Sequence, residues 1–169
     1  HPPGPLLLLD ALRISSAAGA AALCIGAGAL GAPLTYGLGR TLGGERDARV
    51  AGVLFACSPL TVLFGVTSFD FLFATCGLVA ACLLVAEGRA ARAAGAAALA
   101  GASLMSWALL AIGAWAVVVA WRRRGSRSAA GLAVACALAW LGLNAALAAA
   151  FGYDPIGTLR ATEGVYRHS

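Results

Sequence analysis

Apolar runs of membrane-helix length, separated by short polar breaks, make up most of this chain. Because a bilayer has a hydrocarbon core of about 30 Å, a spanning helix needs roughly 17–25 apolar residues. Segments near or within that range predict an all-α fold, a polytopic transmembrane helical bundle of about six spans, some of them short. The expected spans cover residues 16–39, 50–66, 69–86, two halves of 93–121, and 129–151.

The stretch 93–121 carries no charge and would measure roughly 43 Å as a single helix, which exceeds the hydrocarbon core. It is either one tilted span or two short spans that break near residues 103–106. Arginines in short loops favour the cytoplasmic side of a membrane. With two short spans, nine of the twelve arginines share one side, so this arrangement is preferred. These nine are Arg40, Arg46, Arg49, Arg89, Arg92, Arg122, Arg123, Arg124 and Arg127.

Two amphipathic segments flank the spans. Residues 1–15 predict an outer interfacial segment, and residues 152–169 predict an outer interfacial helix that begins with Asp154 as a cap. We therefore expect 1–169 to be a partial transmembrane domain, with the spans within 16–151. The chain begins at His1 without an initiator methionine, so we expect it to be a piece of a longer protein.

Composition agrees with a membrane protein. The chain of 169 residues is 61% hydrophobic and 11% charged, with a mean hydropathy of +0.87, which lies outside the usual range of soluble domains. All basic residues are arginine, and alanine and glycine are abundant, which is typical of a GC-rich bacterial genome and suggests a bacterial plasma membrane. The net charge of +5 lies mostly in short loops, so membrane orientation explains it and no nucleic-acid partner is predicted. No cysteine–histidine cluster predicts a metal site.

Asp70 is the only ionisable residue in the polar break between the second and third expected spans. An unpaired carboxylate in hydrocarbon is very costly, so this break should lie at a membrane surface or beside a donor. In the expected topology, His1 and the interfacial Arg160 lie on the same side, and a shared site is our hypothesis. The alternatives stay open: a solvated loop histidine for His1, a helix cap for Asp70, and anchoring to anionic lipid for Arg160.

Four short motifs occur in a familiar order. They are HPP at 1–3, YGLGR at 36–40, ACSPL at 56–60 and SFD at 68–70. Their order and spacing resemble the GT-C superfamily of membrane glycosyltransferases, in particular the branch of protein O-mannosyltransferases and aminoarabinose transferases. The resemblance extends over about residues 1–121.

The resemblance implies transfer of a sugar from a polyprenyl-phosphate-linked donor to an acceptor glycan, lipid or protein on the outer side of the membrane. It also implies a catalytic Asp or Glu in an outer loop upstream of His1, so no residue of this chain is assigned as the base. His1, Asp70 and Arg160 would then bind substrates. No cofactor is identified, and dependence on a divalent metal stays open.

Two other classes of protein compete with this interpretation. The packed, glycine-rich spans also suit a transporter or channel module, and a purely structural bundle would need only packing and topology. No expected span carries a charge at mid-membrane, which ion or proton coupling usually requires.

Overall fold

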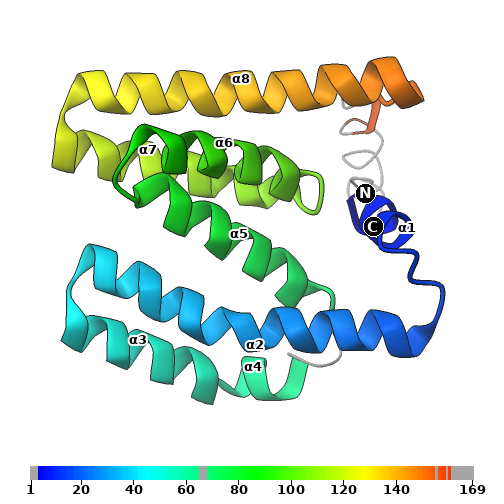
Figure 1. Ribbon diagram of the computed structural model, residues 1–169, viewed down its shortest axis with the longest axis horizontal. Coiled ribbons are helices and arrows are strands. Elements are labelled where there is room, and N and C mark those ends of the chain that lie inside the picture. The colour runs from blue at the N-terminus through cyan, green and yellow to red at the C-terminus, as the bar shows by residue number, and fades with distance from the viewer. Residues whose placement is uncertain (1–3, 65–67, 155, 159, 161–169) are drawn as a thin grey trace.

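The computed structural model describes residues 4–64, 68–154, 156–158 and 160. Within these residues the chain is all helical, so the predicted fold class is confirmed at that level (Figure 1). The elements are α1 (Gly4–Ala11), α2 (Ala17–Leu42), α3 (Glu45–Cys57), α4 (Pro59–Phe64), α5 (Asp70–Val85), α6 (Arg89–Ser103), the 3-10 turn η1 (Trp107–Leu109), α7 (Leu110–Arg124) and α8 (Ser126–Phe151).

Successive long helices run in opposite directions, so their connections gather at two ends of the bundle (Figure 1). One end, which we call the arginine end, holds residues 40–49, 86–92 and 122–127. The turns there contain Gly44, Gly88 and Gly125, whose φ angles are 106°, 99° and 83°. Only glycine adopts such angles without steric cost, so these turns can be as short as they are. The opposite end holds α1, the 68–70 turn, η1 and residues 152–154.

The charge-free stretch 93–121 divides as the arginine distribution predicts. Helix α6 ends at Ser103, the chain turns through residues 104–106, and α7 begins at Leu110 after η1. The Ser103 hydroxyl donates to the main-chain oxygen of Ala100 at 2.7 Å, inside the last turn of α6. The two halves return antiparallel to one another (Figure 1).

The segment 50–66 was expected to form one span, and it breaks at Pro59. Helix α3 ends at Cys57, and Ser58 is extended, with φ −61° and ψ 130°. Proline disfavours a helical conformation in the preceding residue, so a separate helix α4 begins at Pro59. Pro33, in contrast, lies inside α2 without ending that helix.

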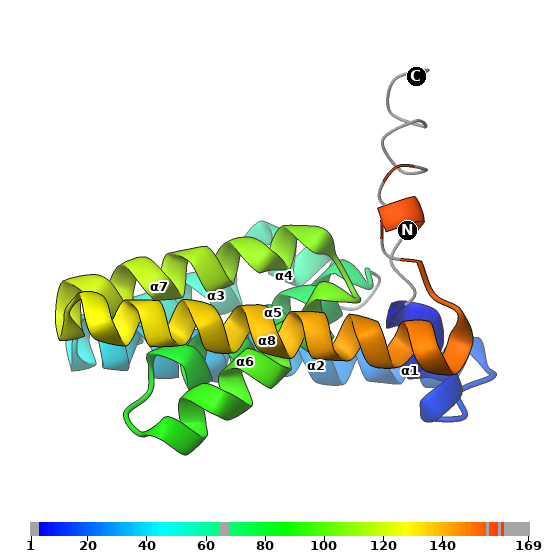
Figure 2. The same ribbon diagram turned by 90° about the horizontal axis from the view of Figure 1, so that it is seen from above.

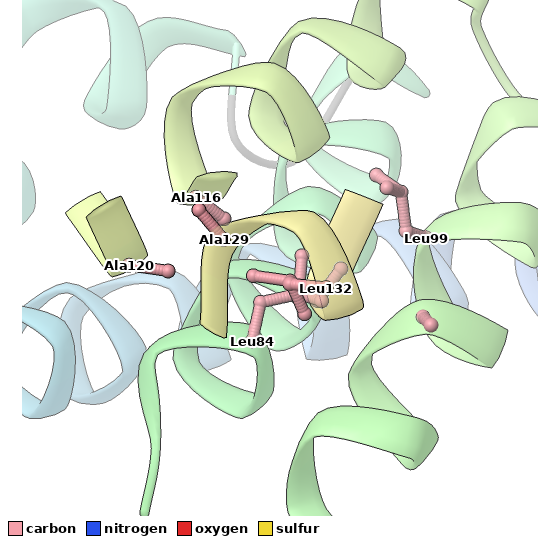
Figure 3. Packing of buried hydrophobic residues seen from close by; sticks show 8 residues of the cluster. Leu84, Leu99, Ala116, Ala120, Ala129 and Leu132 are labelled. Carbon is pink, nitrogen blue, oxygen red and sulfur yellow. The ribbon is translucent and has the colours of Figure 1, made fainter. Parts of the chain in front are cut away.

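Small side chains fill the interior, and large apolar side chains face outward. In the core, Leu84 and Leu132 point toward one another (Figure 3). The other buried members of this cluster are Ala80, Ala96, Leu99, Ala116, Ala120 and Ala129. On the outside, Leu54 is 66% exposed and Leu138 is 65% exposed. This distribution is typical of helices that pack through small residues and present large apolar residues to lipid.

Two helices, α2 and α8, are long and apolar enough to cross a membrane, each with 26 residues. Helix α5 is apolar but has only 16 residues. Helix length and composition therefore support two candidate spans among the described residues. The prediction of about six spans is confirmed only to this extent.

Candidate functional site

Asp70 is the first residue of α5 and lies at the end opposite the arginines. The Ser68 hydroxyl donates to Asp70 Oδ2 at 2.8 Å, and the Asp70 main-chain N–H donates to Ser68 Oγ at 3.1 Å. Asp70 is exposed, so its carboxylate avoids the cost of burial. The turn is closed by Ser68, and the Asp70 carboxylate remains accessible at the start of the helix.

Two contacts fix α5 beneath Asp70. The buried Thr75 hydroxyl donates to the main-chain oxygen of Ala27 in α2 at 2.8 Å. The rings of Phe55 and Phe71 meet edge to face, with centroids 6.4 Å apart. Because a buried hydrogen bond and an aromatic contact both hold the first turns of α5, the position of Asp70 relative to α2 and α3 is well determined.

A groove of about 530 Å³ runs along the face of α5 that Asp70 heads. Helical periodicity places Asp70, Ala74, Gly77 and Ala81 on one face, at steps of three and four residues. The last three of these residues line the groove, which therefore extends about 10 Å along the helix below Asp70. We call it the Asp70 groove. Its lining residues are Thr35, Leu38, Phe55, Ala74, Gly77, Leu78, Ala81, Leu109, Ala111, Ile112 and Trp115.

The Asp70 groove is lined by apolar residues except for Thr35, and it is open at the side of the bundle. Thr35 Oγ1 is buried and has no hydrogen-bond partner in the described part of the chain. Ala74, Ala111 and Trp115 are exposed, so the groove is accessible from the side of the bundle. Gly77 brings α5 close to α7, because a Cβ there would lie 2.7 Å from Ile112 Cδ1. Such a groove suits a hydrocarbon chain that enters laterally.

A second apolar groove, of about 490 Å³, lies under α1. Gly4 packs directly on the Leu104 carbonyl group, and its main-chain N–H donates to Leu104 O at 2.8 Å. The α5 residues that line this groove, Thr75, Cys76 and Val79, lie on other faces of the helix than Asp70. The α1 groove is therefore separate from the site that Asp70 heads.

Of the three predicted site residues, the structure describes Asp70 and Arg160. His1 lies outside the described residues. Arg160 is exposed and follows the end of α8; the described residues after α8 turn away from the bundle (Figure 2). The predicted cap before it is confirmed, since Asp154 Oδ1 accepts from the main-chain N–H groups of Ile156 and Gly157 at 3.0 and 2.9 Å.

Asn144, on α8, forms its hydrogen bond within its own helix. Its Nδ2 donates to the main-chain oxygen of Trp140 on its own helix at 2.8 Å. Its Oδ1 is buried without a partner in the described part of the chain, as are the indole nitrogens of Trp107 and Trp140. The two indole rings are 6.2 Å apart, edge to face. This ring contact indicates a packing role for Trp107 and Trp140.

Two titratable groups near the ends of the bundle have pKa values shifted from their ordinary ones. The Arg49 hydrogen bond, followed by that from Tyr36, lowers the pKa of the Glu45 carboxyl. Partial burial raises the pKa of the Tyr153 phenol just beyond α8. The Glu45 group belongs to the arginine end and Tyr153 to the opposite end, and neither lines the Asp70 groove.

Among the described residues, no group of three or more His, Cys, Asp or Glu side chains could hold a metal ion. No known protein family matches the chain, and no curated protein or solved structure matches it either.

Proposed function

We propose that this chain is the membrane part of a GT-C-type glycosyltransferase of a bacterial plasma membrane. It would take a sugar from a polyprenyl-phosphate-linked donor and transfer it to an acceptor on the outer side. The observation that carries the proposal is an exposed carboxylate, Asp70, at the start of α5, one helical turn before Ala74, where the open apolar groove begins on that helix. The order of the four motifs that resembles this superfamily is the second support.

The proposed membrane arrangement has six crossings. They are α2, α3 with α4, α5, α6, α7 and α8, which alternate in direction (Figure 1). The arginine end would face the cytoplasm, because arginines in short loops favour that side. The short crossings α5, α6 and α7 would be compatible with local thinning of the bilayer or with neighbouring helices that cover their ends.

A lipid-linked donor fits this arrangement physically. The polyprenyl chain would lie in the Asp70 groove, and the phosphate and sugar would emerge at the outer surface beside Asp70. In the transfer, a carboxylate accepts the proton of the acceptor as its oxygen bonds to the anomeric carbon. The bond from that carbon to the phosphate oxygen breaks, and polyprenyl phosphate leaves. We assign Asp70 to binding of sugar or acceptor hydroxyls and leave the base unassigned; His1 and Arg160 remain predicted substrate ligands.

No specific observation favours a coupled transporter. The buried polar side chains in the described residues are Thr75, Ser103 and Asn144, and none of them is ionisable. Ion or proton coupling normally uses ionisable side chains within the membrane.

Photo-crosslinking tests where the donor lipid binds. Membranes that contain the protein would be irradiated with a polyprenyl phosphate that carries a diazirine on its isoprenoid chain. We expect labelling of residues in the Asp70 groove that unlabelled polyprenyl phosphate suppresses. Ala111→Phe should fill the groove and remove most of the label. Ala114→Phe is the matched control, because Ala114 lies on the same helix, is also exposed, and lines a different groove.

The substitution Asp70→Asn tests the polar part of the site. Because the expected catalytic carboxylate lies upstream of His1, transfer is measured in membranes that contain the longer protein with that upstream loop. Sugar transfer there should fall strongly, while groove labelling should persist because no hydrocarbon contact changes. Labelling spread evenly over exposed apolar positions, without competition, would exclude the lipid site. Unchanged transfer by Asp70→Asn would exclude the role of Asp70.

A further inference from the structure

A cationic cavity of about 570 Å³ lies at the arginine end, between α6 and α8, and is separate from the Asp70 groove. Its rim carries Arg89, Arg92, Arg124 and Arg127. Its remaining lining residues are Ala93, Ser128, Gly131, Leu132 and Ala135. Four arginines therefore line a cavity whose other lining residues, apart from Ser128, are apolar.

Two of the four arginines are held in place by the protein. Arg92 donates from Nη1 to Ser128 Oγ at 3.1 Å and from Nε to Gly88 O at 3.2 Å. Arg124 Nη2 donates to Val85 O at 2.7 Å. These bonds satisfy some of the donors and leave the positive charges without a counter-ion. In the described part of the chain, none of the four has a carboxylate partner, and Arg89 and Arg127 also lack hydrogen bonds.

The positions of these arginines conflict with helix electrostatics. Arg89 and Arg92 begin α6, and Arg127 lies in the first turn of α8, with no acidic residue in either first turn. The N-terminus of a helix is positive and disfavours cations. Helix α3 starts at the same end with Glu45 and Asp47, as the helix dipole favours. Membrane orientation explains why arginines gather at this end, but it leaves the positive first turns of α6 and α8 without a negative partner; an anion between the two helix ends would supply one.

The apolar wall shows what kind of anion fits. On α8, Arg127, Gly131 and Ala135 succeed one another at i, i+4 and i+8, on one face of the helix. This face therefore changes from cationic to apolar over about 12 Å. A Cβ at Gly131 would meet no atom within 4 Å, so space is open there. A free inorganic anion would use only the rim, whereas an anionic lipid would use both parts.

We propose that this cavity binds one anionic phospholipid of the cytoplasmic leaflet. Its phosphate would lie between Arg89 and Arg127, with Arg92 and Arg124 behind, and the first part of an acyl chain would lie along Gly131 and Ala135. Basic pockets between membrane helices on the cytoplasmic side suit such headgroups. The site does not depend on the proposed sugar transfer, and it would hold the turns before α6 and α8 together.

Native mass spectrometry of the purified chain in detergent tests this site, with phosphatidylglycerol as the probe and phosphatidylcholine as the uncharged comparison. We expect one retained phosphatidylglycerol. Arg127→Gln should weaken it about fivefold, the effect of one basic residue near an anionic surface. Arg46→Gln removes the same charge at the same end but outside the cavity, and should have no effect. Arg89→Gln replaces Arg127→Gln if the latter fails to fold.

A second pair of variants separates a lipid from free phosphate. Gly131→Leu should weaken phosphatidylglycerol binding by filling the apolar wall, while Gly142→Leu on the same helix, also with open space around it, should not. Equal losses in Arg46→Gln and Arg127→Gln would mean diffuse attraction and would overturn the site. If Gly131→Leu retains as much phosphatidylglycerol as the native chain, and inorganic phosphate displaces that lipid, the lipid assignment would be overturned.

Discussion

Arg123 Nη1 donates a 2.8 Å hydrogen bond to the main-chain oxygen of Thr41, and its Nη2 donates to Leu42 O at 2.6 Å. The last carbonyl groups of a helix have no partner within that helix, and they carry its negative end. Arg123, on α7, therefore caps the C-terminus of α2. The next residue, Arg124, does the same for α5 through Val85 O. Two consecutive arginines thus join three helices at one end of the bundle.

Arg123→Gln should loosen the α2–α3 hairpin from the rest of the bundle. We expect a loss of about 1 kcal/mol in unfolding free energy, because the bonds are charge-assisted but exposed to solvent. Hydrogen exchange of the last turn of α2 should quicken at the same time. Arg122→Gln is the matched control, since Arg122 is adjacent, exposed and without a hydrogen bond in the described part of the chain. Equal exchange rates in both variants would contradict the capping role.

Most of the long helices and the break in 93–121 could be predicted from sequence, because charge and apolar length are local properties; the break of 50–66 at Pro59 was not predicted. The bonds of Arg123 could not. The run 122–124 indicates orientation by its charge alone, whereas its hydrogen-bond partners, Thr41 and Val85, become neighbours only when α2, α5 and α7 pack. The same reason limits the site: Asp70 stands out as an isolated carboxylate, but Ala74 and Ala111 are ordinary alanines until folding makes them walls of one groove.

Glu45 should make the α2–α3 turn sensitive to acid. Arg49 Nε donates to Glu45 Oε1 at 2.8 Å, and the Tyr36 hydroxyl donates to Oε2 at 2.9 Å, which together lower the pKa of this carboxyl. Because the folded pKa lies below the unfolded one, the stabilisation is complete at neutral pH. It is lost as the pH falls below the unfolded pKa of a glutamate and through the lowered folded pKa.

Hydrogen exchange of the 41–48 turn, measured between neutral and acidic pH, checks this prediction. Glu45→Gln should abolish the pH dependence of exchange, and Tyr36→Phe should move its midpoint upward. Glu87→Gln, at the same end of the bundle, should leave it unchanged. If the pH dependence of hydrogen exchange persists in Glu45→Gln, another titratable group causes it.

Gly95 should tolerate no larger residue. A Cβ there would lie 2.7 Å from the main-chain nitrogen of Leu84 in α5, whereas a Cβ at Gly101 on the same helix meets nothing within 4 Å. Both changes to alanine gain the same helix propensity, about 1 kcal/mol, so their difference isolates packing. We expect Gly95→Ala to be less stable than Gly101→Ala by about 1–3 kcal/mol in thermal or denaturant unfolding. If Gly95→Ala and Gly101→Ala are equally stable, α5 and α6 pack less closely at Gly95 than the structure indicates.

Asn144→Leu should preserve or raise stability. The side chain is 5% exposed, and its Oδ1 has no partner in the described residues, which costs about 1–3 kcal/mol. Leucine removes that acceptor and keeps the branching at Cγ, whereas Asn144→Ala would remove packing as well. Thermal unfolding of the two variants in one detergent compares them. A marked loss in Asn144→Leu would show that water or another polar group satisfies the amide oxygen.

Six crossings require the connections to alternate between the two membrane faces, and single cysteines in a cysteine-free background test this. An impermeant maleimide applied from outside should label Leu12→Cys and Ser106→Cys, because both lie at the end opposite the arginines. It should reach Glu87→Cys and Ser126→Cys only after permeabilisation, since these flank the arginine end. The informative position is Ser106, which lies between α6 and α7. If Ser106→Cys needs permeabilisation while Leu12→Cys does not, α6 and α7 do not cross separately, and the proposed arrangement fails at that point.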